Sequence, residues 1–168
     1  MSRYVIEKEK LKENIEFIKQ KAGVPVIGVV KGNGYGFGIR EFTSILKENG
    51  ITFFAVTEVT DIPVLKEILD EKDSLLVMRS TCIESEARQI AGSGCIATIG
   101  SRAACRVMEK VADELDTTVK CHLKIDTGMG RYGFMPSEIS KAIECYKMPH
   151  LKFTGIYTHF SSAFRHAE

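Results

Sequence analysis

The sequence predicts an α/β fold, a (β/α)8 TIM-type barrel that is incomplete here, with about six β/α units of the eight. Short runs rich in β-branched residues alternate with amphipathic stretches along the whole chain. The starts of these runs follow one another at intervals of about 20 to 33 residues, which is the length of one β–α unit. Because the runs are nearly continuously apolar, they indicate a parallel sheet covered by helices.

The expected elements follow from this pattern in chain order. Residues 7–21 carry apolar positions at helical spacing and predict an amphipathic helix. Strands are expected at 24–30, 51–56, 74–78, 95–100, 118–125 and 151–160. Helices are expected between them, at about 39–49, 60–71, 83–91, 101–115 and 136–147.

Start and stop signals support these helices. Gly50 and Gly92 are placed to end two of them, since glycine readily takes the left-handed conformation that follows a helix. Three helix starts carry a capping residue or an early proline, namely Asp61 with Pro63, Ser101, and Pro136.

The position of polar residues favours a closed barrel over an open doubly wound sheet. Lys31 follows the first strand, Asp126 to Arg131 follow the fifth, and His159 closes the sixth. A doubly wound sheet would concentrate such residues at one switch point, whereas a barrel spreads them over every strand end. A complete barrel needs about 250 residues, so two sheet edges are expected to stay open and to promote self-association.

Composition excludes several classes of protein. The chain has 168 residues, 44% of them hydrophobic and 27% charged, which suits one sizeable globular core. The net charge is +1 and the basic residues are scattered, so no nucleic-acid surface is expected. No apolar run approaches the roughly 18 residues of a membrane span, and no signal peptide follows Met1. The five cysteines lack a C-x-x-C pair and are expected to be reduced thiols of a cytoplasmic protein, without disulfides or a metal site.

The most informative motif is a lysine between an apolar strand and a glycine-rich loop, in the string KGNGYGFG at 31–38. Alternating glycines allow the backbone to approach a bound group closely. A Lys31 amine held beside such a loop could condense with an aldehyde, which is Schiff-base chemistry. The alternative interpretation is an ordinary strand-end lysine whose amine extends into solvent.

A second motif is the string LKIDTGMGRYGF at 123–134. It contains G-x-G-x-x-G, but Phe134 to Pro136 separate the glycines from the next helix, which argues against a dinucleotide site. The loop instead presents Arg131, whose planar fork can bind a phenolate or a carboxylate at two points. Lys124 and Asp126 lie two residues apart, on one face of the strand, and are expected to support this arginine.

These two segments and the string GIYTHF at 155–160 resemble the N-terminal part of the alanine racemases, fold-type III enzymes that depend on pyridoxal 5'-phosphate (PLP). The family's lysine segment reads like VVKANAYGHG, and this chain has VVKGNGYGFG. The family's arginine loop reads like LKIDTGMGRLGF, from which this chain departs at one position. Residues 1–168 would then be the N-terminal, PLP-binding part of the barrel.

The resemblance implies a role for each matching residue. Lys31 would form the Schiff base with PLP and act as one of two acid–base groups at the substrate Cα. Tyr35 would bind the PLP phosphate, and Arg131 would contact the phenolic oxygen of the ring. Lys124, often carbamylated in this family, would hold Arg131 in place.

Two further residues match positions near the ligands, and other parts of the site are expected elsewhere. His159 would lie beside the pyridine ring, and Met129 near the substrate carboxylate. Two more barrel strands and a β-rich C-terminal domain, whose tyrosine reaches the site from the partner subunit of a homodimer, are expected outside these 168 residues.

The resemblance therefore implies a racemase that interconverts L- and D-alanine for peptidoglycan, represented by a portion that is inactive alone. Two alternatives remain open: a serine-racemising relative, and a non-catalytic PLP-binding barrel protein of cofactor homeostasis.

Overall fold

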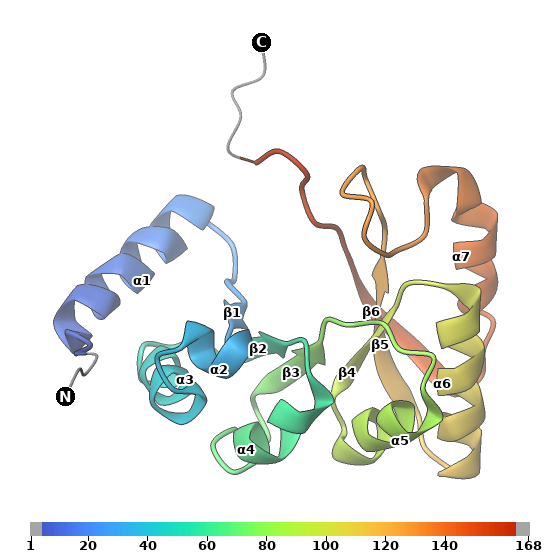
Figure 1. Cartoon of the computed structure of the whole chain (residues 1–168), viewed down its shortest axis with the longest axis horizontal. Coiled ribbons are helices and arrows are strands. Elements are labelled where there is room, and N and C mark those ends of the chain that lie inside the picture. The colour runs from blue at the N-terminus through green and yellow to red at the C-terminus, as the bar shows by residue number, and fades with distance from the viewer. Residues whose placement is uncertain (1–4, 164–168) are drawn as a thin grey trace. The chain divides into compact units, whose positions relative to one another are not determined.

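The computed structural model describes residues 5–163, and the chain forms two compact units, Met1–Leu76 and Val77–Glu168. Strand order equals chain order, β1-β2-β3 and then β4-β5-β6. The pairs β1–β2, β4–β5 and β5–β6 are parallel, and helices alternate with the strands (Figure 1). This alternation confirms the predicted fold class, an incomplete (β/α)8 barrel.

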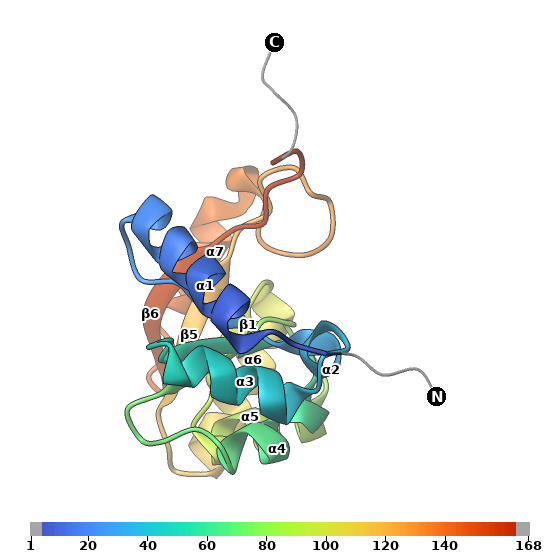
Figure 2. The same cartoon turned by 90° about the vertical axis from the view of Figure 1, so that its left-hand side faces the viewer.

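The first unit packs helices against a short parallel sheet. Val30, Phe54 and Leu65 are fully buried in its core, and α3 lies beside α4 (Figure 2). A Cβ on Gly28 would lie 3.2 Å from Leu46 of α3, so glycine lets this helix approach the sheet. The elements are α1 (Lys8–Ala22), β1 (Gly28–Val29), α2 (Lys31–Tyr35), α3 (Ile39–Glu48), β2 (Phe53–Val56), η1 (Val59–Asp61), α4 (Ile62–Lys66) and β3 (Ser74–Val77), whose last residue opens the second unit.

The first strand is much shorter than the predicted range 24–30. Only Gly28 and Val29 pair with β2, and Val24 is 65% exposed. Pro25 has no N–H to donate to a strand ladder, which explains why pairing begins later.

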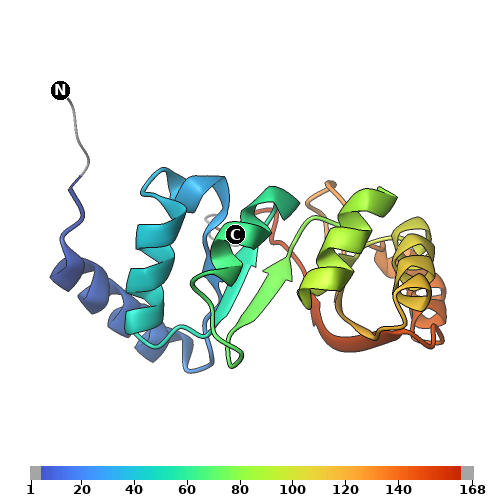
Figure 3. The ribbon, with the colours of Figure 1, turned by 90° about the horizontal axis from the view of Figure 1, so that it is seen from below.

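The second unit places three helices beside its strands. Helix α5 lies against α6, and α6 against α7 (Figures 1 and 3). Along β5 the buried residues Val119, Cys121 and Leu123 alternate with Lys120 and His122, as expected for a strand with one face in the core. The elements are α5 (Glu84–Ser93), β4 (Ile96–Ile99), α6 (Arg102–Glu114), β5 (Val119–Lys124), η2 (Pro136–Glu138), α7 (Ile139–Cys145) and β6 (Leu151–Tyr157).

Of two predicted helix boundaries, the structure confirms the one at Ser101 and contradicts the one at Gly92. Ser101 caps α6 as predicted, since its hydroxyl accepts a hydrogen bond from Ala104 N at 3.1 Å. The prediction for Gly92 was wrong, because Gly92 lies inside α5. Gly94, with φ of +68°, takes the left-handed position that ends this helix.

Among residues 5–163, no helix combines the length and the apolar character that a membrane crossing requires.

Candidate functional site

Lys31 stands where the chain leaves the sheet of the first unit. It is the first residue of α2 and follows the fully buried Val30, whose N–H donates to Ala55 O at 2.9 Å. The lysine is partly buried, and its amine has no hydrogen bond or ion pair with any other described residue. The strand therefore fixes the lysine backbone and leaves the amine open to a ligand.

The segment after Lys31 is a left-handed helical turn, which the glycine pattern alone did not predict. The φ values are +62° at Gly32, +55° at Asn33, +62° at Gly34 and +55° at Tyr35. This conformation costs an L-residue about 1–2 kcal/mol, and glycine avoids that cost. Because two residues other than glycine also adopt it, the turn stores strain, as ligand-binding segments often do.

Hydrogen bonds hold this turn in place. The N–H of Gly34 donates to Val30 O at 3.0 Å, and the N–H of Gly36 donates to Gly32 O at 3.1 Å. Asn33 Oδ1 accepts from the N–H of Ile39 at 3.0 Å, which ties the turn to the start of α3.

Tyr35 ends the left-handed turn. Its side chain is 58% exposed, and its hydroxyl has no hydrogen-bond partner among residues 5–163. Lys31 and Tyr35 thus bracket one strained turn, and neither the amine nor the phenol has a partner within residues 5–163.

In the second unit, Asp126 organises the loop that follows β5. Its carboxylate is 4% exposed and accepts three backbone hydrogen bonds, from Gly128 at 2.9 Å, Gly130 at 3.1 Å and Arg131 at 3.0 Å. These bonds, led by the one from Gly128, lower the pKa of Asp126. Asp126 therefore supports Arg131 through the backbone rather than through the guanidinium.

Gly133 closes the same loop against β5. Phe134 N donates to Lys124 O and Asp126 N donates to Phe134 O, both at 2.9 Å. With φ of +126°, a Cβ on Gly133 would lie 2.8 Å from Asp126 N and 3.0 Å from Lys124 O. No side chain fits this position without moving the backbone.

Lys124 is a buried amine surrounded by carbonyl groups and aromatic rings. It is 2% exposed, and its Nζ donates to Ile125 O at 2.9 Å and to Tyr132 O at 3.3 Å. The rings of Tyr132 and Tyr157 lie 5.5 and 5.7 Å from Nζ. Burial lowers the pKa of Lys124, and the charge of Asp126 opposes that effect.

Sequence reasoning missed the two tyrosines of this cluster. Both hydroxyls donate to Met78 O, from Tyr132 at 2.7 Å and from Tyr157 at 2.9 Å. The Tyr157 hydroxyl also lies 3.0 Å from Thr98 Oγ1. Burial raises the pKa of Tyr157. Tyr132 carried a signal, because it is the position at which the arginine-loop string departs from the family's.

Three other predicted residues of the second unit are exposed. The Arg131 guanidinium lies 5.5 Å from the Tyr132 ring centroid and has no acidic partner in the described part of the chain. Met129 is 39% exposed. His159 is also exposed and lies two residues beyond β6, which ends at Tyr157, so the prediction that His159 closes this strand was wrong.

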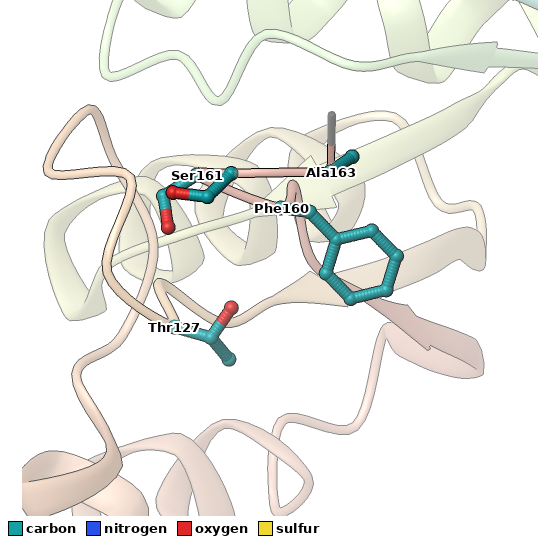
Figure 4. A pocket seen from close by; sticks show the side chains of 5 residues that line it. Thr127, Phe160, Ser161 and Ala163 are labelled. Atoms are coloured by element: carbon teal, nitrogen blue, oxygen red, sulfur yellow. The ribbon is translucent and has the colours of Figure 1, made fainter. Parts of the chain in front are cut away.

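A pocket of about 460 Å3 lies beside the Asp126 loop (Figure 4). Thr127 Oγ1 donates to Thr158 Oγ1 at 2.7 Å, and Thr158 Oγ1 donates to Ile125 O at 2.8 Å. These bonds tie the loop after β5 to the segment after β6. The pocket is lined by three residues that carry hydroxyl groups, Thr127, Ser161 and Ser162, and by Phe160 and Ala163.

The chain matches known proteins over nearly its whole length. The family described as "Alanine racemase, N-terminal domain" matches residues 6–168. An alanine racemase of Chlorobaculum tepidum is 30% identical over 167 residues, which cover 97% of this chain and 44% of that protein.

Two solved structures share the fold. The alanine racemase from Bacillus anthracis with bound L-Ala-P has a TM-score of 0.83 and 25% identity, covering 96% of this chain and 44% of that one. The alanine racemase from Bartonella henselae with covalently bound pyridoxal phosphate has a TM-score of 0.82 and 21% identity, covering 93% and 46%. The chain spans less than half the length of these relatives. It belongs to the alanine racemase family and corresponds to the family's N-terminal domain.

Proposed function

We propose that this chain is the PLP-binding portion of a racemase that acts on alanine. The observation that carries the proposal is the Lys31 amine, unpaired among the described residues and set at the start of a strained turn. Family membership supports the reaction class. The covalently bound pyridoxal phosphate of the Bartonella henselae relative supports the choice of cofactor.

The side chains present fit the chemistry of PLP. The cofactor has an aldehyde, a phenolic oxygen and a phosphate, which call for an amine, a two-point donor and hydrogen-bond donors. Lys31 offers the amine, Arg131 the planar fork and Tyr35 a hydroxyl. None of the three side chains is paired with an acid within residues 5–163.

Each residue then has an assigned task. When bound, PLP delocalises the electron pair left at the substrate Cα after proton removal. Lys31 Nζ would hold the cofactor and move the Cα proton on one face of the substrate. Arg131 would hold the phenolic oxygen, while Lys124 and Asp126 keep the loop of this arginine in shape.

The remaining assignments concern the rim of the site. His159 would lie beside the pyridine ring, and Met129 near the substrate carboxylate. We assign the second base, on the opposite face, to a part of the enzyme outside these 168 residues. The whole enzyme would be a cytoplasmic homodimer that makes D-alanine for peptidoglycan.

Cofactor attachment is the first test. PLP is added to the chain, the adduct is reduced with borohydride, and the labelled peptide is identified by mass spectrometry. We expect one adduct at Lys31 and none in Lys31→Ala. The matched control Lys66→Ala, which removes an exposed lysine of α4 in the same unit, should label normally. An adduct on another lysine would refute the assignment.

Proton exchange is the second test. The PLP-loaded chain is incubated with L-alanine in D2O, and NMR and chiral chromatography follow the product. With one base, we expect deuterium at Cα without formation of D-alanine. D-alanine made by these 168 residues would contradict the two-base argument, and binding without exchange would favour the PLP-carrier alternative.

A further inference from the structure

Tyr132 connects the arginine loop to two other segments of the second unit. Its hydroxyl donates to Met78 O at 2.7 Å, 54 residues earlier in the chain. Its ring packs against Gly100, where a Cβ would lie 3.4 Å from Cδ2 of the tyrosine. Its carbonyl oxygen accepts from Lys124 Nζ at 3.3 Å. Tyr132 thus connects the loop to residues at the ends of β3, β4 and β5.

The same ring contacts two cations. Lys124 Nζ and Arg131 Cζ each lie 5.5 Å from the ring centroid. The face of an aromatic ring attracts a cation, more strongly where water is excluded. Neither cation has a carboxylate partner in the described part of the chain, because Asp126 binds backbone N–H groups instead. The ring therefore offers an electron-rich surface to both cations, beside the two carbonyl oxygens to which Lys124 Nζ donates.

An exposed arginine samples many side-chain conformations, and ordering them costs binding free energy. A ring contact limits that sampling before a ligand arrives. The hydroxyl bond to Met78 in turn limits movement of the ring. Leucine, the family's residue in the corresponding string, could fill the space but has neither a hydroxyl group nor a π-face.

We propose that Tyr132 is a positioning residue that presents the Arg131 guanidinium to an anionic oxygen of the ligand. The identity of that ligand, PLP, rests on the proposed function. The positioning itself is a property of the chain without cofactor and is testable separately.

The first measurement is PLP affinity in the full chain. Tyr132→Leu should weaken binding about tenfold, and Tyr132→Phe, which keeps the ring, about two- to threefold. The matched control is Tyr146→Leu, which replaces an exposed tyrosine stacked on Phe153 and should bind PLP normally. Wild-type affinity in Tyr132→Leu would overturn the proposal.

The second measurement needs no cofactor. NMR follows the titration of the Lys124 amine and the exchange of the Gly130 and Arg131 amides. Tyr132→Leu should lower the pKa of Lys124 further, because the charged amine loses the ring face, whereas Tyr132→Phe should leave this pKa unchanged. Both variants should speed amide exchange, since both lose the bond to Met78.

The outcomes distinguish failure of the proposed function from failure of the role proposed for Tyr132. If the wild-type chain does not bind PLP, the proposed function fails, yet the exchange of the Gly130 and Arg131 amides still tests whether Tyr132 orders the segment that carries Arg131. If Tyr132→Leu does not fold, Tyr132→Phe decides, and unchanged affinity with unchanged amide exchange would refute the proposal.

Discussion

Gly133 is the most crowded of the three glycines that follow Asp126 in the arginine loop. Its missing side chain leaves room for the backbone of Lys124 and Asp126, and its φ is +126°. Gly133→Ala combines a backbone clash with a conformation that L-residues avoid, so we expect the free energy of unfolding to fall by about 2–3 kcal/mol. Urea denaturation measures the change.

A matched glycine variant separates this effect from a general response to alanine. Gly92 lies inside α5, with nothing within 4 Å of its ideal Cβ. Gly92→Ala should stabilise the chain by about 0.5–1 kcal/mol, because alanine favours the helix. If both substitutions lowered the free energy of unfolding equally, the effect at Gly133 would be a general response to alanine, and the prediction would be refuted.

Lys31 is a residue whose position could be predicted from the sequence around it. The sequence predicted its place after an apolar strand. The structure adds that its amine has no hydrogen bond or ion pair with another residue of 5–163. Lys124 shows the opposite case. Its burial among two tyrosines depends on residues 8 and 33 positions later, which no local pattern around it could indicate.

At the scale of elements, the left-handed turn depends on its glycines. Gly32 has φ of +62° and nothing within 4 Å of an added Cβ, so alanine there would meet backbone strain without a clash. We expect Gly32→Ala to lower the free energy of unfolding by about 1 kcal/mol. A thermal or urea unfolding curve unchanged by this substitution would show that the turn is not left-handed in solution.

A histidine ties α6 to the start of β6. His150 Nδ1 lies 2.9 Å from Glu109 Oε1, and its Nε2 lies 3.6 Å from Asp113 Oδ1. The bond to Glu109 is the main cause that raises the pKa of His150, and desolvation opposes it. The folded state therefore holds the histidine proton more tightly than the unfolded state does.

The raised pKa makes the contribution of His150 to stability depend on pH. Stabilisation by His150 is complete below its unfolded pKa of about 6.5 and is lost as the pH rises through the higher folded pKa. The stability difference between wild type and His150→Gln should be larger at about pH 5.5 than at about pH 8.5. Urea midpoints of both proteins across this range test the prediction, and a difference independent of pH would contradict it.

At the scale of the whole molecule, the open side of β6 is the feature that predicts association. Within residues 5–163, β6 pairs with β5 alone, and Ile156 on β6 is 61% exposed. Helix α7 and the residue that follows it add exposed apolar side chains in the same unit, namely Ile139, Ile143 and Tyr146. Open strand edges with apolar side chains favour pairing with a second copy.

We expect light scattering to show self-association that grows with concentration. Ile156→Lys should weaken it about tenfold, since a charged edge strand resists pairing. Ser85→Lys, which adds the same charge at an exposed position of α5, should leave it unchanged. A strictly monomeric wild-type chain at high concentration would refute the prediction.

Much of the fold could be predicted because its signals are local. Apolar runs located five strands to within a few residues, and Ser101 marked the start of α6 through its own side chain. The errors arose where local signals compete. Pro25 interrupts a run that otherwise looks like a strand, and Gly92 and Gly94 are both plausible helix ends.

The roles of the candidate site residues stay predictions, whereas the local geometry of their segments can be compared with the structure. The glycine spacing after Lys31 indicated a close backbone but not a left-handed turn, because alternating glycines suit several conformations. Asp126 was expected to support the arginine. The sequence did not indicate that its carboxylate would accept from the backbone N–H of Arg131, because this contact depends on the folded loop.

The sequence by itself determined the order of strands and helices, the lysine at a strand end, and the strings that place this chain in its family. These features depend on residue type and on spacing over a few positions. The tertiary structure decided that Tyr132 reaches Met78, that two rings surround Lys124, and that burial lowers the pKa of this amine. Such contacts join residues far apart in the chain, so they exist once the strands have paired and the helices have packed.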